Sequence, residues 1–326
     1  MEQIKRIGVL TSGGDAPGMN AAIRAVVRTA IYHNIEVYGI KRGYAGLIDR
    51  DWQKLSTTDV SNIIQRGGTM LKTARSEAFR TAEGRAKAFA HMAAEDMNAL
   101  VVIGGDGSFR GAHAFSREFP VNIVGIPGTI DNDIKGTDYT LGFDTAVNTA
   151  VEAIDKIRDT ASAHDRIFIV EVMGRDAGYI ALYSGISCGA EDILIPETVT
   201  NVETVLQHIA ADKGRKKLMR IIVVAEGDDF GGAQALQQMV QQRFPNLEVR
   251  SLVLGHIQRG GSPSCFDRMQ ASRLGYAAVE ALLAGKSGLM LGLHEWQIHY
   301  TPFDAAVKQN TMIQDELLKI AEVLAL

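Results

Sequence analysis

Residues 127–133, PGTIDND, carry a hydroxyl and two carboxylates close together: Thr129, Asp131 and Asp133. If this segment is extended, all three side chains point to one side, because side chains alternate along a strand. Phosphoryl transfer needs a positioned hydroxyl, a base that takes its proton, and cations that balance the phosphate charge. One aspartate could act as that base while the other assists a metal ion. In an arbitrary protein, the same letters would indicate an Asx-rich turn.

A second candidate site is the loop GGDGS at 104–108, which follows the apolar run VVI. Its small residues would let a phosphate approach the backbone closely. Asp106 is placed to hold Mg²⁺, which prefers one or two carboxylates together with phosphate oxygens and water. An aspartate that only caps the next helix gives the same pattern.

A similar loop, GGDAPG at 13–18, follows the first apolar run and precedes a helical pattern. Backbone N–H groups and a helix N-terminus at such a place favour a phosphate, although a tight strand–helix turn uses the same glycines. The loop lacks the Lys-Ser/Thr ending of a Walker A motif and is not a GxGxxG fingerprint. An ordinary P-loop enzyme and a Rossmann dehydrogenase are therefore disfavoured. Two such loops in one chain favour phosphate binding.

The elements that position these segments follow from the hydrophobic pattern. Nearly unbroken apolar runs predict strands buried on both faces, at 4–10, 100–103, 123–126, 167–172, 221–225 and 252–254. Apolar residues at helical spacing predict helices at 21–31, 145–157, 202–209 and 272–283. This alternation predicts an α/β fold with mostly parallel, helix-flanked sheets. The length suits two lobes with the active site in the cleft between them.

The composition excludes several classes of protein. The 326 residues carry 34 basic and 38 acidic side chains, and the net charge of −4 argues against bulk attraction to nucleic acid or a membrane. Cys188 and Cys265 lie far apart without metal-ligand spacing, so neither a disulfide framework nor a zinc site is expected. No apolar run approaches the roughly 20 residues that cross a bilayer. The first strand begins too early for a signal peptide, so we expect a cytoplasmic protein.

Taken in order, GGDAPG, GGDGS and PGTIDND resemble the bacterial-type, ATP-dependent phosphofructokinase family. The resemblance continues through GFDTA at 142–146, VMGR at 172–175 and LGHIQRGG at 254–261, up to about residue 290. It implies glycolytic transfer of the γ-phosphoryl of Mg-ATP to the 1-hydroxyl of fructose 6-phosphate, giving fructose 1,6-bisphosphate and ADP. It also implies a larger ATP-binding lobe of residues 1–142 and 258–308 and a smaller sugar-phosphate-binding lobe of residues 143–257 and 309–326.

The resemblance assigns roles to individual residues. Asp131 is expected to be the general base, with Thr129 beside it and Asp133 as a second acid near the metal. Arg175 is expected to steady the transferring phosphoryl, where preorganised positive charge counts most. The residues implied for Mg-ATP are Gly14, Arg75, Ser76, Asp106, Gly107 and Ser108, with Asp106 holding the Mg²⁺ cofactor.

A third set is implied for the sugar phosphate. Its members are Thr129, Asp131, Met173, Gly174, Arg175, Glu226, His256 and Arg259 from one subunit, joined by Arg166 and Arg250 from a neighbouring subunit. Arginine can fork two hydrogen bonds onto the 6-phosphate. A lone arginine that begins a strand is usually a solvated edge residue, and only the resemblance favours the functional interpretation. The family implies a homotetramer.

The choice of phosphoryl donor depends on two glycines. Pyrophosphate-dependent members of the family typically carry Asp at the position of Gly107 and Lys at that of Gly128, so the glycines favour ATP. The alternatives are a pyrophosphate-dependent enzyme and a catalytically idle regulatory subunit that binds nucleotide or sugar phosphate. The idle subunit is disfavoured because all four expected catalytic residues are present: Asp106, Asp131, Asp133 and Arg175.

The resemblance also implies an allosteric site for ADP or phosphoenolpyruvate. Its expected members are Arg24, Arg28, Arg158, Gly189, Glu191, Arg215 and Lys217. Arg24 and Arg28 are four residues apart, so they share a helix face and could pair on one anion, although solvated helix arginines are common. Thr57 stands where a further arginine is expected. We therefore expect a site that binds these effectors weakly or prefers a different ligand, with blunted inhibition by phosphoenolpyruvate.

Overall fold

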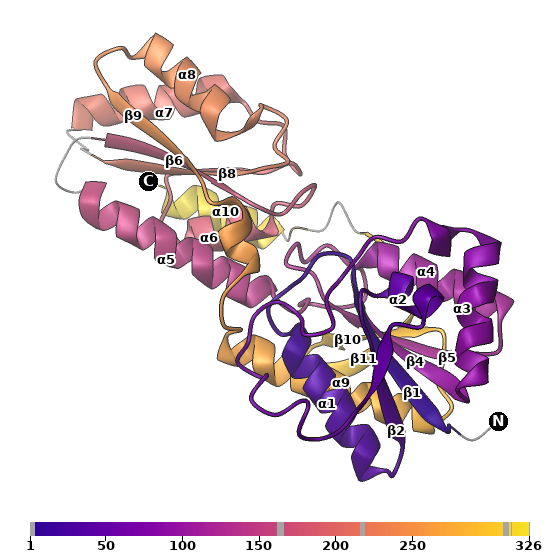
Figure 1. Cartoon of the computed structure of the whole chain (residues 1–326). Helices are drawn as coiled ribbons and strands as arrows, with labels where there is room; N and C mark the ends of the chain where they lie inside the picture. Colours follow the sequence, from indigo (N-terminus) through magenta and orange to yellow (C-terminus); the bar gives the residue numbers. More distant parts are fainter. Residues whose placement is uncertain (1–3, 162–165, 216–218, 309–312, 314, 326) are drawn as a thin grey trace. The chain divides into compact units, whose positions relative to one another are not determined.

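The computed structural model describes residues 4–161, 166–215, 219–308, 313 and 315–325. The chain divides into two compact units, one formed by Met1–Thr145 with Arg259–Gln309 and the other by Ala146–Gln258 with Asn310–Leu326. Each unit contains one β-sheet with helices on both faces (Figure 1).

The first unit is built on a seven-stranded sheet. Its strands are β1 (Arg6–Ser12), β2 (Glu36–Ile40), β3 (Trp52–Leu55), β4 (Met97–Gly104), β5 (Asn122–Pro127), β10 (Leu289–His294) and β11 (Gln297–Pro302). They lie in the order β11-β10-β5-β4-β1-β2-β3. The inner strands β10, β5, β4, β1 and β2 run parallel, and the edge strands β3 and β11 pair antiparallel to their neighbours. β1 and β4 are almost wholly buried because helices cover both faces of the sheet.

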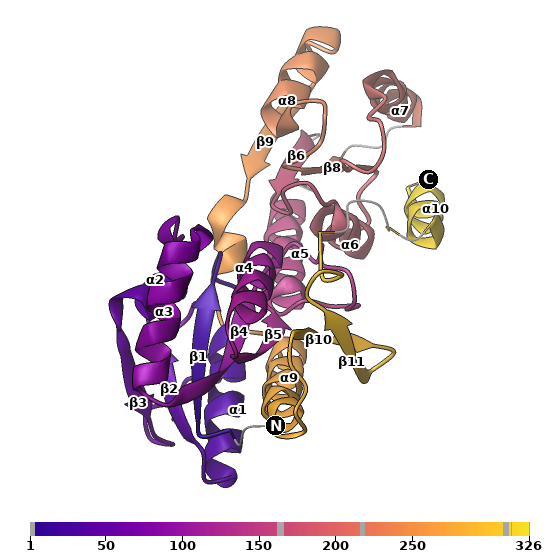
Figure 2. The same ribbon diagram turned by 90° about the vertical axis from the view of Figure 1, so that its right-hand side faces the viewer.

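The helices of this unit form two layers (Figures 1 and 2). They are α1 (Met19–Tyr32), α2 (Tyr44–Asp49), η1 (Ala78–Arg80), α3 (Ala82–Ala94), α4 (Asp106–Glu118) and α9 (Cys265–Leu283). α1 and α9 pack together on one face, and α2, α3 and α4 cover the other. Side-chain caps fix two helix starts, since Thr81 and Ser264 accept backbone N–H groups at the beginning of α3 and α9.

The second unit has a four-stranded, all-parallel sheet in the order β7-β8-β6-β9. The strands are β6 (Arg166–Val172), β7 (Asp192–Leu194), β8 (Arg220–Ala225) and β9 (Glu248–Val253). The helices are α5 (Phe143–Ala161), α6 (Tyr179–Cys188), α7 (Val202–Arg215), α8 (Gly232–Arg243), η2 (Gly255–Arg259) and α10 (Asp315–Leu324). α7 and α8 share a core with one face of the sheet, while α5 and α6 lie on the other face (Figure 1). α10 packs against α6.

The expectation of an α/β fold with mostly parallel, helix-flanked sheets is confirmed. All six apolar runs contribute to strands, although the run at 252–254 is only the end of β9. The strands β2, β3, β7, β10 and β11 were not expected. β2, β3, β7 and β11 are short or partly exposed, and polar residues interrupt their apolar pattern. β10 is apolar and largely buried, so its run at 289–293 was overlooked in the sequence.

Candidate active site

The three chemistry-bearing loops of the first unit start side by side. β1, β4 and β5 are adjacent and parallel, with Ser12 opposite Gly104 and Gly104 opposite Pro127. The loops that follow therefore leave the same edge of the sheet, at the carboxyl ends of the strands, where open α/β sheets bind ligands. The sheet brings together segments that are about ninety and twenty residues apart in the sequence.

The GGDGS loop turns directly into α4. A side chain on Gly104 would collide with the Ser12 carbonyl and with Ser108, so the close approach of β1 and β4 requires glycine here. Gly105 caps the helix and Asp106 lies in its first turn, where backbone N–H groups and the helix dipole favour anions. Gly107 has open space around the position that a β-carbon would occupy. This end of α4 can therefore receive phosphate oxygens.

The GGDAPG loop contacts Arg259, which lies far from it in the sequence. Nη1 of Arg259 donates a hydrogen bond to the Asp15 carbonyl over 3.1 Å, and a β-carbon on Gly14 would lie 2.5 Å from the same nitrogen. Gly13 adopts φ +89°, a backbone conformation that favours glycine. One predicted sugar-phosphate residue and one predicted nucleotide residue are thus in contact within this unit.

Arg75 and Ser76 belong to the loop between β3 and η1. The Thr11 hydroxyl donates to the Lys72 carbonyl over 3.0 Å and lies 3.0 Å from the Thr69 hydroxyl, so this loop is tied to the end of β1. Ser76 accepts the Phe79 N–H, and Arg75 is exposed. The exposed guanidinium is available to an anion at the same sheet edge.

The TIDND segment is not extended, so the expected strand-like alternation of its side chains is wrong. β5 ends at Pro127, and Asn132 has φ 53°, a left-handed conformation that interrupts the extended backbone between the two acids. The Asn132 side chain ties this segment to residues 138–140, accepting the Thr140 N–H at 2.8 Å and donating to the Asp138 carbonyl at 3.1 Å. These bonds reach residues six and eight positions further along the chain, so they are not the local bonds of the Asx turn considered as the alternative.

Both acids of the segment are nevertheless buried. Asp131 is 3% exposed, and its N–H donates to the Thr129 hydroxyl over 3.3 Å. Asp133 is 5% exposed, and its Oδ2 lies 3.1 Å from Nζ of Lys308. Lys308 was missed in the sequence because it lies in the C-terminal stretch that carries no motif.

The carboxylates fit a magnesium ion that arrives with a nucleotide. Within the described part of the chain, no three His, Cys, Asp or Glu side chains are grouped as a metal cage. Asp106 is 18% exposed, and its partner Arg110, 2.7 Å away, is 72% exposed and able to move aside. One accessible carboxylate suits Mg²⁺, which takes its remaining ligands from phosphate and water. Asp133 already has Lys308 as a partner.

Another buried acid, Asp267, ties α9 to residues 142–145 of the same unit. Asp267 is 1% exposed and accepts the N–H groups of Gly142 and Thr145 at 2.8 and 2.9 Å, as well as the Thr145 hydroxyl. Burial raises the pKa of Asp267 to about 6, against the effect of these hydrogen bonds. The pattern Ser264-x-x-Asp267 could have marked a helix start, but not the contact with α5.

In the second unit, the predicted sugar-phosphate residues follow β6, β8 and β9. Glu226 comes directly after β8 and accepts the N–H groups of Gly174 and Arg175 at 3.4 and 2.8 Å. Arg175 has φ 52°, so Glu226 holds a left-handed turn. Gln258, which is fully buried, accepts the Met173 N–H at 2.9 Å. His256 is exposed in η2, just past β9.

Arg166 and Arg250 lie toward the opposite end of this sheet. Arg166 is the first residue of β6 and pairs with Glu248, the first residue of β9, over 2.8 Å. Arg250 binds the same carboxylate over 2.7 Å and is 60% exposed. The two arginines therefore lie close to each other, near the starts of β6 and β9. Met173 and Glu226 lie just past the carboxyl ends of β6 and β8.

The predicted effector residues fall in both units. Arg24 and Arg28 lie on α1. The pKa of Arg24 is lowered, mainly by burial and to a smaller extent by the positive charge of Arg28. In the second unit, Arg158 donates to the Cys188 carbonyl and lies 3.4 Å from the Gly189 carbonyl. The side chain of Arg215, the last residue of α7, and the whole of Lys217 lie outside the described residues.

Two details bear on the strength of that site. Glu191 is 8% exposed and uses one carboxylate oxygen to accept the Ile221 N–H at 2.7 Å. Thr57 is exposed, and Arg50, seven residues earlier in the sequence, pairs with Glu95 at 2.7 Å. Arg50 therefore already has an acidic partner.

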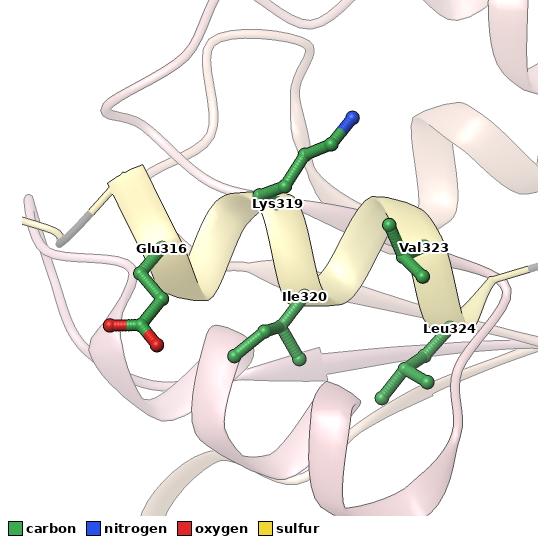
Figure 3. Close-up of a pocket in the computed structure, with 5 residues that line it drawn as sticks. All are labelled: Glu316, Lys319, Ile320, Val323 and Leu324. Atoms are coloured by element: carbon green, nitrogen blue, oxygen red, sulfur yellow. The ribbon is translucent and has the colours of Figure 1, made fainter.

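A surface hollow on α10 shares no residue with these sets (Figure 3). It is lined by Glu316, Lys319, Ile320, Val323 and Leu324, all on one helix.

No helix in the described ranges is long and apolar enough to span a membrane.

Comparison with known proteins decides the family. The family model for phosphofructokinase matches residues 6–282. The chain belongs to the phosphofructokinase family. A relative in this family, ATP-dependent 6-phosphofructokinase 1 of Thermus thermophilus, is 56% identical over 323 residues, covering 99% of this chain and 100% of the relative. ATP-dependent 6-phosphofructokinase 2 of Bacteroides thetaiotaomicron is 49% identical over 326 residues, covering all of both chains.

Solved phosphofructokinase structures have the same fold. The enzyme of Saccharomyces cerevisiae superimposes with a TM-score of 0.88 at 35% identity, covering 98% of this chain. The chain spans 48% of that yeast chain's length. A pyrophosphate-dependent phosphofructokinase of Marinobacter aquaeolei gives a TM-score of 0.85 at 27% identity, covering 99% of this chain and 92% of that one.

Proposed function

We propose that this protein transfers the γ-phosphoryl of Mg-ATP to the 1-hydroxyl of fructose 6-phosphate, giving fructose 1,6-bisphosphate and ADP in glycolysis. The observation that carries the proposal is the common sheet edge from which the GGDAPG, GGDGS and PGTIDND loops leave. At this edge lie the N-terminus of α4, which can bind an anion, the accessible carboxylate of Asp106, and the buried Asp131, which could act as a base. Full-length relatives named ATP-dependent 6-phosphofructokinase support the choice of reaction.

In the proposed mechanism, the first unit binds the nucleotide. The start of α4, with Gly107 and Ser108, receives phosphate oxygens together with Gly14, and Arg75 and Ser76 approach from the neighbouring loop. Asp106 holds the magnesium ion, which when bound neutralises phosphate charge. The open space at Gly107 leaves room for a nucleotide and supports ATP as the donor.

The chain's own side chains then carry the proton and the charge. Asp131 takes the proton from the sugar 1-hydroxyl, and Thr129 helps to orient that hydroxyl. Arg175 stabilises the charge of the transferring phosphoryl, and the hydrogen bond from its backbone N–H to Glu226 holds the turn that carries this side chain. Met173, Gly174, Glu226, His256 and Arg259 form the sugar-phosphate subsite.

We further propose that Arg166 and Arg250 complete the sugar-phosphate site of a neighbouring subunit. The seven residues of β6 span roughly 20 Å between Arg166 and the turn at Met173, too far for one small sugar phosphate to contact both within one chain. A homotetramer provides such neighbours. The effector site binds ADP or phosphoenolpyruvate weakly because Thr57 supplies no charge. The protein acts in the cytoplasm.

The test is a coupled assay of the purified protein with fructose 6-phosphate and either ATP or pyrophosphate, each with Mg²⁺. Turnover with ATP and only background turnover with pyrophosphate is the expected result. Turnover with pyrophosphate but not with ATP would show that pyrophosphate is the donor. Binding of both substrates without turnover would identify a regulatory subunit.

A further inference from the structure

Lys308 is held next to Asp133, the second acid of the TIDND segment, by main-chain contacts as well as by its side chain. Nζ of Lys308 lies 3.1 Å from Oδ2 of Asp133, whose side chain is only 6% exposed, whereas that of Lys308 is 27% exposed. Lys308 also pairs antiparallel with Ile134, and the Lys135 N–H donates to the Val307 carbonyl at 3.0 Å. The main chain therefore fixes the backbone of Lys308 beside the segment, and the ion pair places its ammonium group against Asp133.

The electrostatics of the segment give the lysine a function. Asp131 and Asp133 are both nearly buried and only two residues apart. Two carboxylates removed from water repel each other, and a buried charge is costly unless it is paired. The ammonium of Lys308 offsets one of the two charges and orients the carboxylate that carries it.

We propose that Lys308 is a positioning residue for phosphoryl transfer. It fixes Asp133 and balances its charge, and so keeps the turn in which Asp131 acts as base in its productive geometry. This inference rests on the proposed function. Lys308 makes its contribution through Asp133 and not by touching the substrate.

Three single variants test this role by steady-state kinetics. Lys308→Met should lower kcat about 10–100-fold, the usual cost of losing a partner that orients a functional ligand. The KM values for ATP and fructose 6-phosphate should change by less than about threefold, because in this proposal Lys308 contacts neither bound substrate. Lys308→Arg, which keeps the charge, should retain most of kcat. Lys54→Met, which removes an exposed ion pair with Glu36 in the same unit, is the matched control and should leave kcat unchanged.

A double-mutant cycle with Asp133→Asn separates positioning from a general structural effect. Lys308→Met should cause little further loss of kcat in the Asp133→Asn background. An equal loss in both backgrounds, or an unchanged kcat in Lys308→Met, overturns the proposal. If Lys308→Met does not fold, recovery of folding in the double variant supports the charge balance, and failure to recover overturns it.

The unmodified protein is assayed first, so the two proposals fail separately. No transfer from ATP or pyrophosphate overturns the proposed function, and the role of Lys308 with it. Once transfer is measured, a full kcat in Lys308→Met overturns only the role of Lys308.

Discussion

The guanidinium of Arg259 covers Gly14: a β-carbon on this glycine would lie 2.5 Å from Nη1. Gly14→Ala should leave the fold intact, because the obstructing atom is the end of a flexible side chain. It should displace the guanidinium and raise the KM for fructose 6-phosphate roughly 10–100-fold, the size of a lost charge-assisted hydrogen bond. Saturation kinetics measure this change. In the Arg259→Ala background the effect should disappear, and a full effect there would contradict it.

Replacing the proposed base should stop turnover without unfolding the protein. Asp131→Asn keeps the shape of a side chain that is 3% exposed but removes its ability to take a proton. We expect kcat to fall about 10²–10⁴-fold, with ATP binding by calorimetry nearly unchanged. Asp304→Asn, at an exposed position, is the control. Near-normal turnover of Asp131→Asn would rule out this base.

The exposed Arg250 allows a test of subunit sharing. Arg250→Ala should weaken fructose 6-phosphate affinity by about 1.5–3 kcal/mol and ATP affinity less, whereas Arg243→Ala, at another exposed arginine, should change neither. Oligomers refolded from Arg250→Ala and Asp131→Asn subunits should regain part of the activity that each variant lacks. Absence of recovery in verified mixed oligomers would argue against a shared site.

Thr57 is exposed, so an arginine fits there without a steric cost. The unmodified protein should show blunted inhibition by millimolar phosphoenolpyruvate in a fructose 6-phosphate saturation curve. Thr57→Arg should strengthen inhibition roughly 10–100-fold in effector concentration, as one charge-assisted phosphate contact is gained. The neighbouring Thr58→Arg should not. Strong inhibition of the unmodified protein, unaltered by Thr57→Arg, would show that the missing arginine does not matter.

Asp267 should give the stability a distinctive pH dependence. Its pKa rises from 3.8 in the unfolded chain to about 6 in the fold, so the native state holds the proton more tightly. The associated stability is fully present below about pH 3.8 and is lost as the pH rises through about 6, a change of about 3 kcal/mol. Urea unfolding of the unmodified protein and Asp267→Asn across this range measures it. Their difference in free energy of unfolding should decline toward pH 6, and a constant difference would contradict the shift.

The sequence by itself determined the family, the α/β class and the glycine-rich loops that we propose bind phosphate. Unbroken apolar runs such as VVI before GGDGS predict buried parallel strands, and glycine clusters after them predict ligand loops, because both signals are local. What only the tertiary structure decided depends on contacts between distant residues. The turn at Asn132, the cover of Gly14 by Arg259, the hold of Asp267 on α5 and the pairing of Lys308 with Asp133 join segments that no periodicity connects. Backbone hydrogen bonds and burial fix those contacts once the sheets form, so they appear in the fold and not in the pattern.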